Sequence, residues 1–282
     1  MNSAYLTKWL GRTEECHDEI VPMPIRALAA MLDHGQKPYG DQDSIPPLAH
    51  WLSFLPTPQQ SRIGPDGHPE RGDFLPAVEL PRRMWAGGRL HFHRPLRIGD
   101  EVSRVSTIAD ISAKSGKTGQ LVFVLVRHEI RNSDGAIISE EQDIVYRDNP
   151  TPHSTKPVAI SAPQDYHWIR EIHPDPILLF RFSALTFNGH RIHYDRRYAQ
   201  ECEGYPGLVV HGPLIATLLV DLLLRNVPNA NLESFTFRAI SPLFDTASFA
   251  VCGRIEADGK TVSLWAKNSE GGLAMSATAL LR

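Results

Sequence analysis

The chain has 282 residues, of which 42% are hydrophobic, enough for one large domain or two domains of common size. The formal net charge is −3, and Lys and Arg are scattered rather than clustered, so nucleic-acid binding is not expected. The sequence contains no run of about 18 apolar residues and therefore predicts no membrane span.

The cysteines and the N-terminus indicate a cytoplasmic protein. Cys16, Cys202 and Cys252 are an odd, widely spaced set, which argues against a disulfide framework and favours a reducing compartment. The N-terminus lacks the basic start and apolar core of a signal peptide. Glycine-rich phosphate loops and dinucleotide fingerprints are missing, so we predict no cofactor.

The first half reads as a helix, a loop and then strands. Apolar residues recur with a helical period over 19–34, and Gly35 is a plausible helix end. Residues 56–82 are rich in Pro, Gly and Asp, which predicts a long surface loop. Alternating and β-branched segments then predict four strands, over 89–93, 101–110, 121–132 and 136–147.

The second half repeats this scheme after a proline- and serine-rich linker. Residues 214–225 are apolar on nearly every face, which is typical of a buried helix. Strands are predicted over 232–239, 246–257, 261–268 and 273–281. A helix followed by antiparallel strands, occurring twice, predicts two sheets that each wrap a central helix. We place the domains at 1–150 and 164–282, with a linker over 151–163.

One short segment gathers groups that can transfer protons. Residues 187–195 read Phe-Asn-Gly-His-Arg-Ile-His-Tyr-Asp, and Val210-His211-Gly212-Pro213 then opens the apolar helix. Histidine suits proton transfer because its unperturbed pKa is about 6.5. Free N–H groups at a helix start favour a developing negative charge. The layout is therefore typical of a site that moves protons beside an oxyanion.

These residues give the chain a family likeness. With 66–72, 81–88 and 204–208, they resemble the MaoC-like double hot-dog enoyl-CoA hydratases, and within that group the itaconyl-CoA and mesaconyl-C4-CoA hydratases. The resemblance implies an α+β fold with two antiparallel sheets that each wrap a central helix. The family pattern places an aspartate five residues before a histidine. Here His193 matches the histidine, whereas Asn188 stands at the aspartate position.

The resemblance implies roles for three catalytic candidates, each with a simpler alternative. His193 becomes the general base toward water, or else a buried structural histidine. Asn188 cannot exchange a proton, so it holds the attacking water or merely supports a tight turn beside Gly189. If it holds the water, one histidine performs both proton transfers, or Tyr194 or Asp195 assists. Gly212 donates its N–H to the oxyanion, or only begins a helix before Pro213.

The substrate-binding candidates lie around these three residues. Arg191, assisted by His190, is predicted to bind the free carboxylate of a dicarboxylic acyl group, or alternatively to pair with Asp195. Asp195 itself is expected to cap a short helix over 196–202. By resemblance, segment 85–88 lines the acyl tunnel, although a β-bulge or turn would also explain its glycines. The full set of substrate-binding candidates is Arg191, His190, His211, Trp85, Gly87 and Gly88.

No metal is predicted, because His190, His193, His211 and Asp195 fit no known ligand spacing. CoA enters as part of the substrate, and a homodimer is compatible with the sequence. The leading interpretation is a hydratase that converts itaconyl-CoA, through mesaconyl-C4-CoA, to citramalyl-CoA. Two alternatives stay open: a 3-hydroxyacyl-thioester dehydratase of fatty-acid metabolism, and a non-catalytic acyl-CoA-binding protein.

Overall fold

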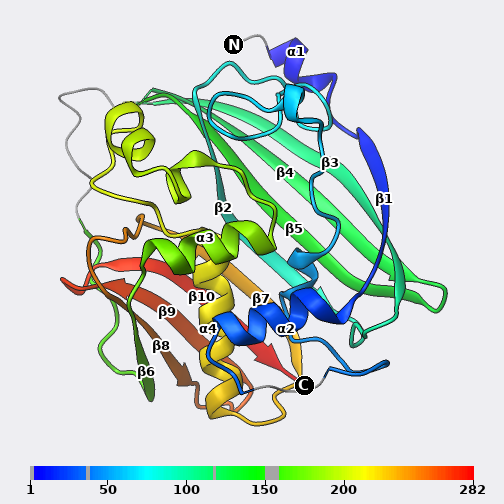
Figure 1. Cartoon of the computed structure of the whole chain (residues 1–282), viewed down its shortest axis with the longest axis vertical. Coiled ribbons are helices and arrows are strands. Elements are labelled where there is room, and N and C mark those ends of the chain that lie inside the picture. The colour runs from blue at the N-terminus through cyan, green and yellow to red at the C-terminus, as the bar shows by residue number, and fades with distance from the viewer. Residues whose placement is uncertain (1–2, 36–38, 117–118, 150–158) are drawn as a thin grey trace.

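A single antiparallel sheet forms the framework of the molecule (Figure 1). The computed structural model describes residues 3–35, 39–116, 119–149 and 159–282. Ten strands lie in the order β1-β3-β4-β5-β2-β7-β10-β9-β8-β6. They are β1 Thr13–Glu19, β2 Arg82–Phe92, β3 Glu101–Gly116, β4 Gly119–Asn132, β5 Gly135–Arg147, β6 Trp168–Ile172, β7 Leu232–Ala239, β8 Phe249–Ile255, β9 Thr261–Asn268 and β10 Leu273–Leu281.

Strands β2 and β7 join the two halves of the chain. Gly87 to His91 of β2 pair antiparallel with β7, so the N-terminal and C-terminal strands form one continuous surface. The predicted strands appear at or near their expected places, and both halves are antiparallel. The alternating sequence pattern reflects the two faces of a strand, since buried and more exposed residues alternate along most of β4. The two predicted sheets are thus joined edge to edge into one ten-stranded sheet.

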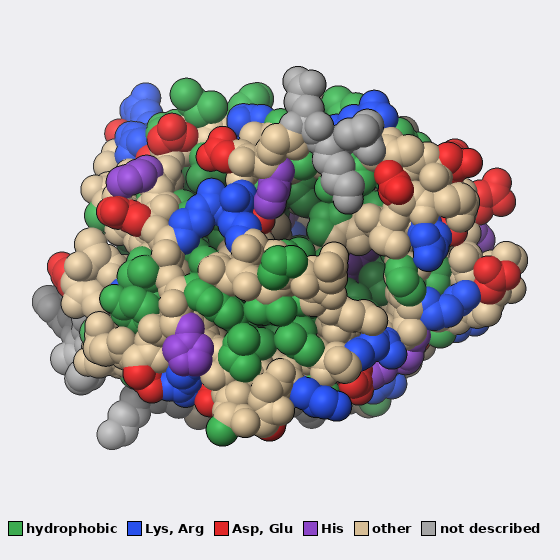
Figure 2. Space-filling model, turned by 90° about the horizontal axis from the view of Figure 1, so that it is seen from below, with side chains coloured by type: hydrophobic (Ala, Val, Ile, Leu, Met, Phe, Trp, Pro, Cys, Tyr) green, Lys and Arg blue, Asp and Glu red, His purple; other side chains and the backbone are tan. Residues whose placement is uncertain are grey.

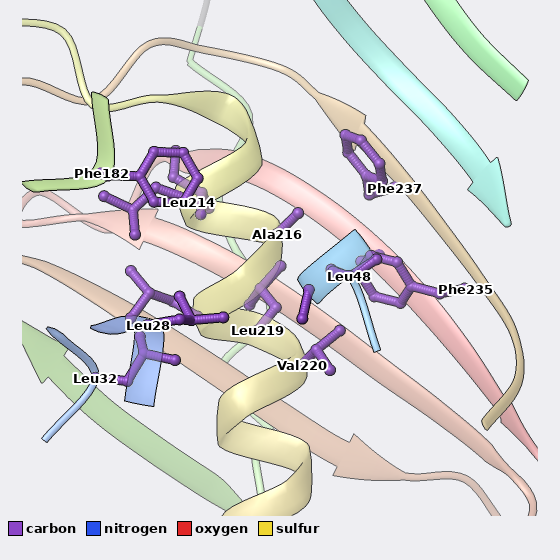
Figure 3. Packing of buried hydrophobic residues seen from close by; sticks show 14 of the residues in the cluster. Leu28, Leu32, Leu48, Phe182, Leu214, Ala216, Leu219, Val220, Phe235 and Phe237 are labelled. Carbon is purple, nitrogen blue, oxygen red and sulfur yellow. The ribbon is translucent and has the colours of Figure 1, made fainter. Parts of the chain in front are cut away.

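Helix α4 (Gly212–Asn226) is the central helix of the C-terminal half. Every residue from Leu214 to Leu223 is buried, as a helix that is apolar on nearly every face predicts, and the buried stretch includes Thr217 and Asp221. Figure 3 shows how its neighbours enclose it: Leu28 and Leu32 lie on one side, Phe182 lies near its start, and Phe235 and Phe237 approach from β7. The helices and short turns are α1 Ser3–Thr7, α2 Pro22–Met31, α3 Pro176–Leu185, η1 Ala49–Leu52, η2 Gln60–Arg62, η3 Arg191–His193 and η4 Tyr198–Cys202.

The N-terminal helix α2 is shorter than the range 19–34 predicted from periodicity. Residues before Pro22 form β1, which pairs with β3 along the sheet edge, and Pro22 fits the first turn of a helix. Helix α2 packs against α3, which the sequence analysis missed along with β1 and β6. A separate buried cluster, which includes Leu6, Val78 and Leu80, packs on strands of the N-terminal half.

The linker predicted over 151–163 lies largely outside the described residues, and the domain boundaries on either side stay a prediction. In the described part of the chain, no helix is long and apolar enough to cross a membrane. On the face seen in Figure 2, hydrophobic side chains gather in one region among charged side chains of both signs.

Candidate active site

The segment 187–195 folds as a tight loop between α3 and η4. Phe187 adopts a left-handed conformation with φ +48°, and the Asn188 N–H donates to the Ser183 carbonyl over 2.8 Å. The Asn188 side-chain oxygen accepts a bond of 3.0 Å from the His190 N–H, which is a short-range turn of the kind asparagine favours. The amide of Asn188 therefore supports the turn, and its NH₂ group is left to bind another partner.

His193 is buried at the end of η3 with one ring nitrogen committed. Its Nδ1 lies 2.7 Å from the Val209 carbonyl oxygen. Because a carbonyl can only accept, Nδ1 carries the hydrogen and Nε2 keeps its lone pair. Burial lowers the pKa of His193 to about 4, so the imidazole is neutral at pH 7 and can accept a proton.

His193 belongs to a row of four imidazole rings. Its ring stacks on that of His211 at 3.7 Å and lies 5.4 Å from that of His190. The row continues to His68, whose ring is 3.9 Å from that of His190. Burial is the main cause that lowers the pKa of all four, to about 2 for His190. His190 and His193 are therefore neutral at physiological pH.

Each end of this histidine row, defined as His68, His190, His193 and His211, meets a polar side chain. The Nε2 atom of His211 lies 2.8 Å from the Ser183 hydroxyl, and Nδ1 of His68 lies 3.0 Å from the Asp66 carboxylate. Asp66 and His68 come from the N-terminal half of the chain, so both halves build the site. Sequence reasoning assigned them no role, although the Asp-Gly-His spacing within a glycine-containing loop was a visible signal.

Two glycines allow the loop over 64–70 to touch the loop over 187–195, called the reactive loop below. The Arg191 N–H donates to the Asp66 carbonyl over 2.9 Å. A Cβ atom on Gly67 would lie 1.8 Å from the Gly189 carbonyl oxygen, and Gly67 also has φ +88°. A Cβ atom on Gly189 would in turn lie 2.7 Å from the Gly67 carbonyl oxygen. Side chains at these positions would separate the loops, so glycine is needed for contact.

Gly212 is the first residue of α4, directly after the buried His211. The first N–H groups of a helix have no intrahelical acceptor, and the helix dipole adds partial positive charge there. Gly212 lies against the Trp85 backbone, since its Cβ position is 3.8 Å from that carbonyl oxygen. The His211 Nδ1 atom is buried without a hydrogen-bond partner among the described residues. The helix start beside His193 therefore suits a developing anion.

Arg191 is already engaged by the protein. Its guanidinium bonds one Asp195 oxygen over 3.0 and 2.7 Å, donates to the Pro65 carbonyl over 3.0 Å, and lies 4.2 Å from the centre of the Tyr198 ring. Asp195 also accepts from the Tyr198 N–H over 3.0 Å, as expected of a cap. Asp195 thus neutralises the charge of Arg191 and takes two of its five N–H donors, as in the alternative role predicted for this arginine.

Segment 85–88 forms a β-bulge at the junction of the two halves. The register of β2 shifts between Trp85 and Gly87, and the Trp85 indole donates to the Gly87 carbonyl over 2.8 Å. Its ring packs against those of Trp51 and Phe237, at 5.0 and 5.8 Å. Cβ atoms on Gly87 and Gly88 would each lie 2.8 Å from atoms of Phe237. Close strand packing thus accounts for the glycines, and their predicted contact with the acyl chain stays a prediction.

One group of described side chains has the composition of a metal site. Ligand atoms of Asp66, His68 and His190 all lie within 4.8 Å of one another. This is a different set from the one weighed on sequence grounds. Asp66 and His68 are 3.0 Å apart, at hydrogen-bond distance, so each already has a polar partner. The contact between them is that of a carboxylate–imidazole pair.

Comparison with known proteins identifies the family. The profile of the family described as "Hydroxyacyl-thioester dehydratase type 2" matches residues 48–245, which include every residue of the histidine row. The chain belongs to this family. It is 47% identical over 279 residues to the mesaconyl-C(4)-CoA hydratase of Chloroflexus aurantiacus, which covers 99% of this chain and 98% of the relative. The mitochondrial hydroxyacyl-thioester dehydratase type 2 of Schizosaccharomyces pombe is 28% identical, over 74% of this chain and 77% of its own.

Solved structures support the same fold for this member of the family. A MaoC-like dehydratase from Phytophthora capsici aligns with a TM-score of 0.72 at 14% identity, covering 100% of this chain and 99% of its own. A Mycobacterium tuberculosis protein described as having a double hot-dog fold aligns with a TM-score of 0.59 at 14% identity, over 97% and 96% of the chains. The protein is thus an enzyme of the hydro-lyase class with the MaoC-like fold, as the resemblance implied.

Proposed function

We propose that this enzyme hydrates a short dicarboxylic enoyl-CoA, with mesaconyl-C4-CoA as the preferred substrate and citramalyl-CoA as the product. Itaconyl-CoA would enter by isomerisation to mesaconyl-C4-CoA. The observation that carries the proposal is the buried His193 with its Nε2 lone pair available beside the start of α4. The relative that is 47% identical over nearly the whole chain is named for this activity.

The site residues supply a base, a ligand for the attacking water and a donor to the oxyanion. His193 Nε2 takes a proton from water, and the resulting hydroxide attacks the β carbon. Negative charge then develops on the thioester oxygen, where the Gly212 N–H and the α4 dipole stabilise it. The Asn188 NH₂ group, which the turn leaves available, donates to the attacking water. CoA is part of the substrate, and these steps draw only on protein groups.

A panel of purified thioesters tests the proposal. We expect loss of the conjugated-thioester absorbance with mesaconyl-C4-CoA. Its kcat/KM should be about tenfold or more above that for crotonyl-CoA, because a site that binds a substrate carboxylate discriminates against an analogue that lacks it. Itaconyl-CoA should also yield citramalyl-CoA. Preference for long-chain 3-hydroxyacyl thioesters would instead favour a fatty-acid dehydratase. Tight binding of every thioester without turnover would indicate an acyl-CoA sensor.

The acyl carboxylate needs a cation, and Arg83 is a second candidate besides Arg191. Arg83 is half-buried on β2, and its positive charge acts on His68 and His190 and on the Tyr146 hydroxyl. No carboxylate lies within 4.0 Å of its guanidinium nitrogens in the described part of the chain. Because Arg191 is held by Asp195, Arg83 is the cation with more capacity to bind an anionic substrate.

Arg83→Met and Arg191→Met distinguish these two arginines. We expect Arg83→Met to lower the ratio of kcat/KM for mesaconyl-C4-CoA over crotonyl-CoA about 30-fold, in the range for a hydrogen bond to a charged group. Arg191→Met should lower both values together, because that arginine tethers the reactive loop. A ratio unchanged in Arg83→Met and collapsed in Arg191→Met would return the carboxylate contact to Arg191.

A further inference from the structure

Hydration requires two proton transfers, and His193 accounts for one of them. One proton leaves water for His193, and a second must reach the α carbon. The aspartate of the general family pattern would be a second group that exchanges protons, but Asn188 stands at that position and cannot exchange one. Under the proposed function, on which this inference rests, the site therefore needs another acid.

His68 differs from the rest of the histidine row in having a carboxylate partner. One Asp66 oxygen lies 3.0 Å from His68 Nδ1, and the other accepts from the His68 backbone N–H over 3.0 Å. His193 bonds a carbonyl and His211 a hydroxyl. A neighbouring carboxylate stabilises an imidazolium more than a carbonyl does, because the carboxylate carries a negative charge. Among these rings, His68 is therefore the one best able to hold a proton.

The position of His68 suits a group that works opposite His193. It lies across the His190 ring from His193, and its charge acts on His193. Its side chain is 20% exposed, so a proton can be exchanged with solvent between turnovers, whereas His193 is buried. The two glycines in backbone contact, Gly67 and Gly189, fix this placement.

We propose that His68, oriented by Asp66, is the acid that protonates the α carbon during hydration. His193 takes a proton from water as the C–O bond forms at the β carbon. The π electrons move onto the thioester as an enolate, and the α carbon then takes the proton from the His68 imidazolium Nε2. The cycle leaves His193 protonated and His68 neutral; before the next turnover His193 releases its proton as the product leaves, and His68 takes one from solvent. Dehydration runs the same steps in reverse.

The charges around His68 determine how its activity depends on pH. Burial lowers its pKa, the Asp66 carboxylate opposes that shift, and the cations Arg71 and Arg83 reinforce it. The neighbouring ring of His190 is neutral, since its pKa is about 2. Hydration requires His68 protonated, so kcat/KM should fall as pH rises through the His68 pKa. Removing the Asp66 charge lowers that pKa and should move this alkaline limb to lower pH.

The test compares His68→Gln, Asp66→Asn and the exposed control His17→Gln, using mesaconyl-C4-CoA and crotonyl-CoA. We expect His68→Gln to lower kcat about 100-fold with KM nearly unchanged and to remove the alkaline limb, because general acid catalysis contributes roughly 10²–10⁴-fold. Asp66→Asn should lower kcat about tenfold and shift the limb to lower pH. His17→Gln should match the wild type. Circular dichroism and thermal melting confirm that each variant is folded.

The outcomes separate this inference from the proposed function. If the wild type hydrates neither thioester, the proposed function fails. If the wild type is active but His68→Gln keeps kcat within threefold, or Asp66→Asn leaves the alkaline limb in place, only the His68 role is overturned. Loss of activity in EDTA with recovery on added Zn²⁺ would show that Asp66, His68 and His190 bind a metal, which would also overturn it.

Discussion

Replacing His193 with glutamine should lower kcat for hydration by about 10³-fold while leaving the fold intact, in the range expected when an acid–base group is lost. Glutamine is close to histidine in length and stays neutral, but its amide cannot take up a proton at neutral pH. What is lost is the lone pair at Nε2. Stopped-flow or steady-state measurement of thioester absorbance gives the effect directly.

The pH profile checks whether His193 acts as the base. Because burial holds its pKa at about 4, the ring stays neutral down to that pH, and the acid limb of kcat/KM should appear only as pH drops through about 4. His17→Gln is the control, since that side chain is 76% exposed. Hydration that survives in His193→Gln at more than a tenth of the wild-type rate would contradict the assigned role.

Gly67→Ala should abolish most activity and lower the melting temperature. Its new Cβ would lie 1.8 Å from the Gly189 carbonyl oxygen, so the two loops must separate. Separation would break the bond from the Arg191 N–H to the Asp66 carbonyl and move His68 away from His190. We expect about a 100-fold loss of kcat, because misplacement by about 1 Å can have that effect.

Gly259→Ala is the matched control for this prediction. Gly259 also has a positive φ, +69°, but a Cβ there meets no atom within 4 Å. Its substitution costs about 1 kcal/mol of backbone strain and should leave kcat unchanged. Equal activity losses in the two variants would show that backbone strain, and not the contact between Gly67 and Gly189, explains the result.

Local sequence patterns predicted the elements whose buried residues recur with a regular period along the chain. The apolar run over 214–225 predicted α4 within a few residues, and period-two alternation located β7, β9 and β10 at their observed bounds. Periodicity did not locate β1, and the helix predicted over 19–34 began three residues early, at Glu19, which pairs with β3. An edge strand has few buried side chains, so its pattern is weak: β1 has no buried residue.

The candidate site divides in the same way. Residues adjacent in sequence, from Asn188 to His193 and from His211 to Gly212, were identified because their chemistry is concentrated in short segments. The sequence did not decide between the alternative roles of these residues. Whether Arg191 faces a ligand or Asp195 depends on side-chain placement, and the structure places it against Asp195.

The sequence by itself therefore determined the family, the repeated helix-and-sheet plan and the two segments that bring His193 to the start of α4. Only the tertiary structure decided that Asp66 and His68 complete the histidine row. The reason is physical: contact between the 64–70 and 187–195 loops depends on two glycines whose backbones touch, and that proximity arises only when the two halves of the sheet pair through β2 and β7. Long-range pairing of this kind leaves no periodic trace in either segment.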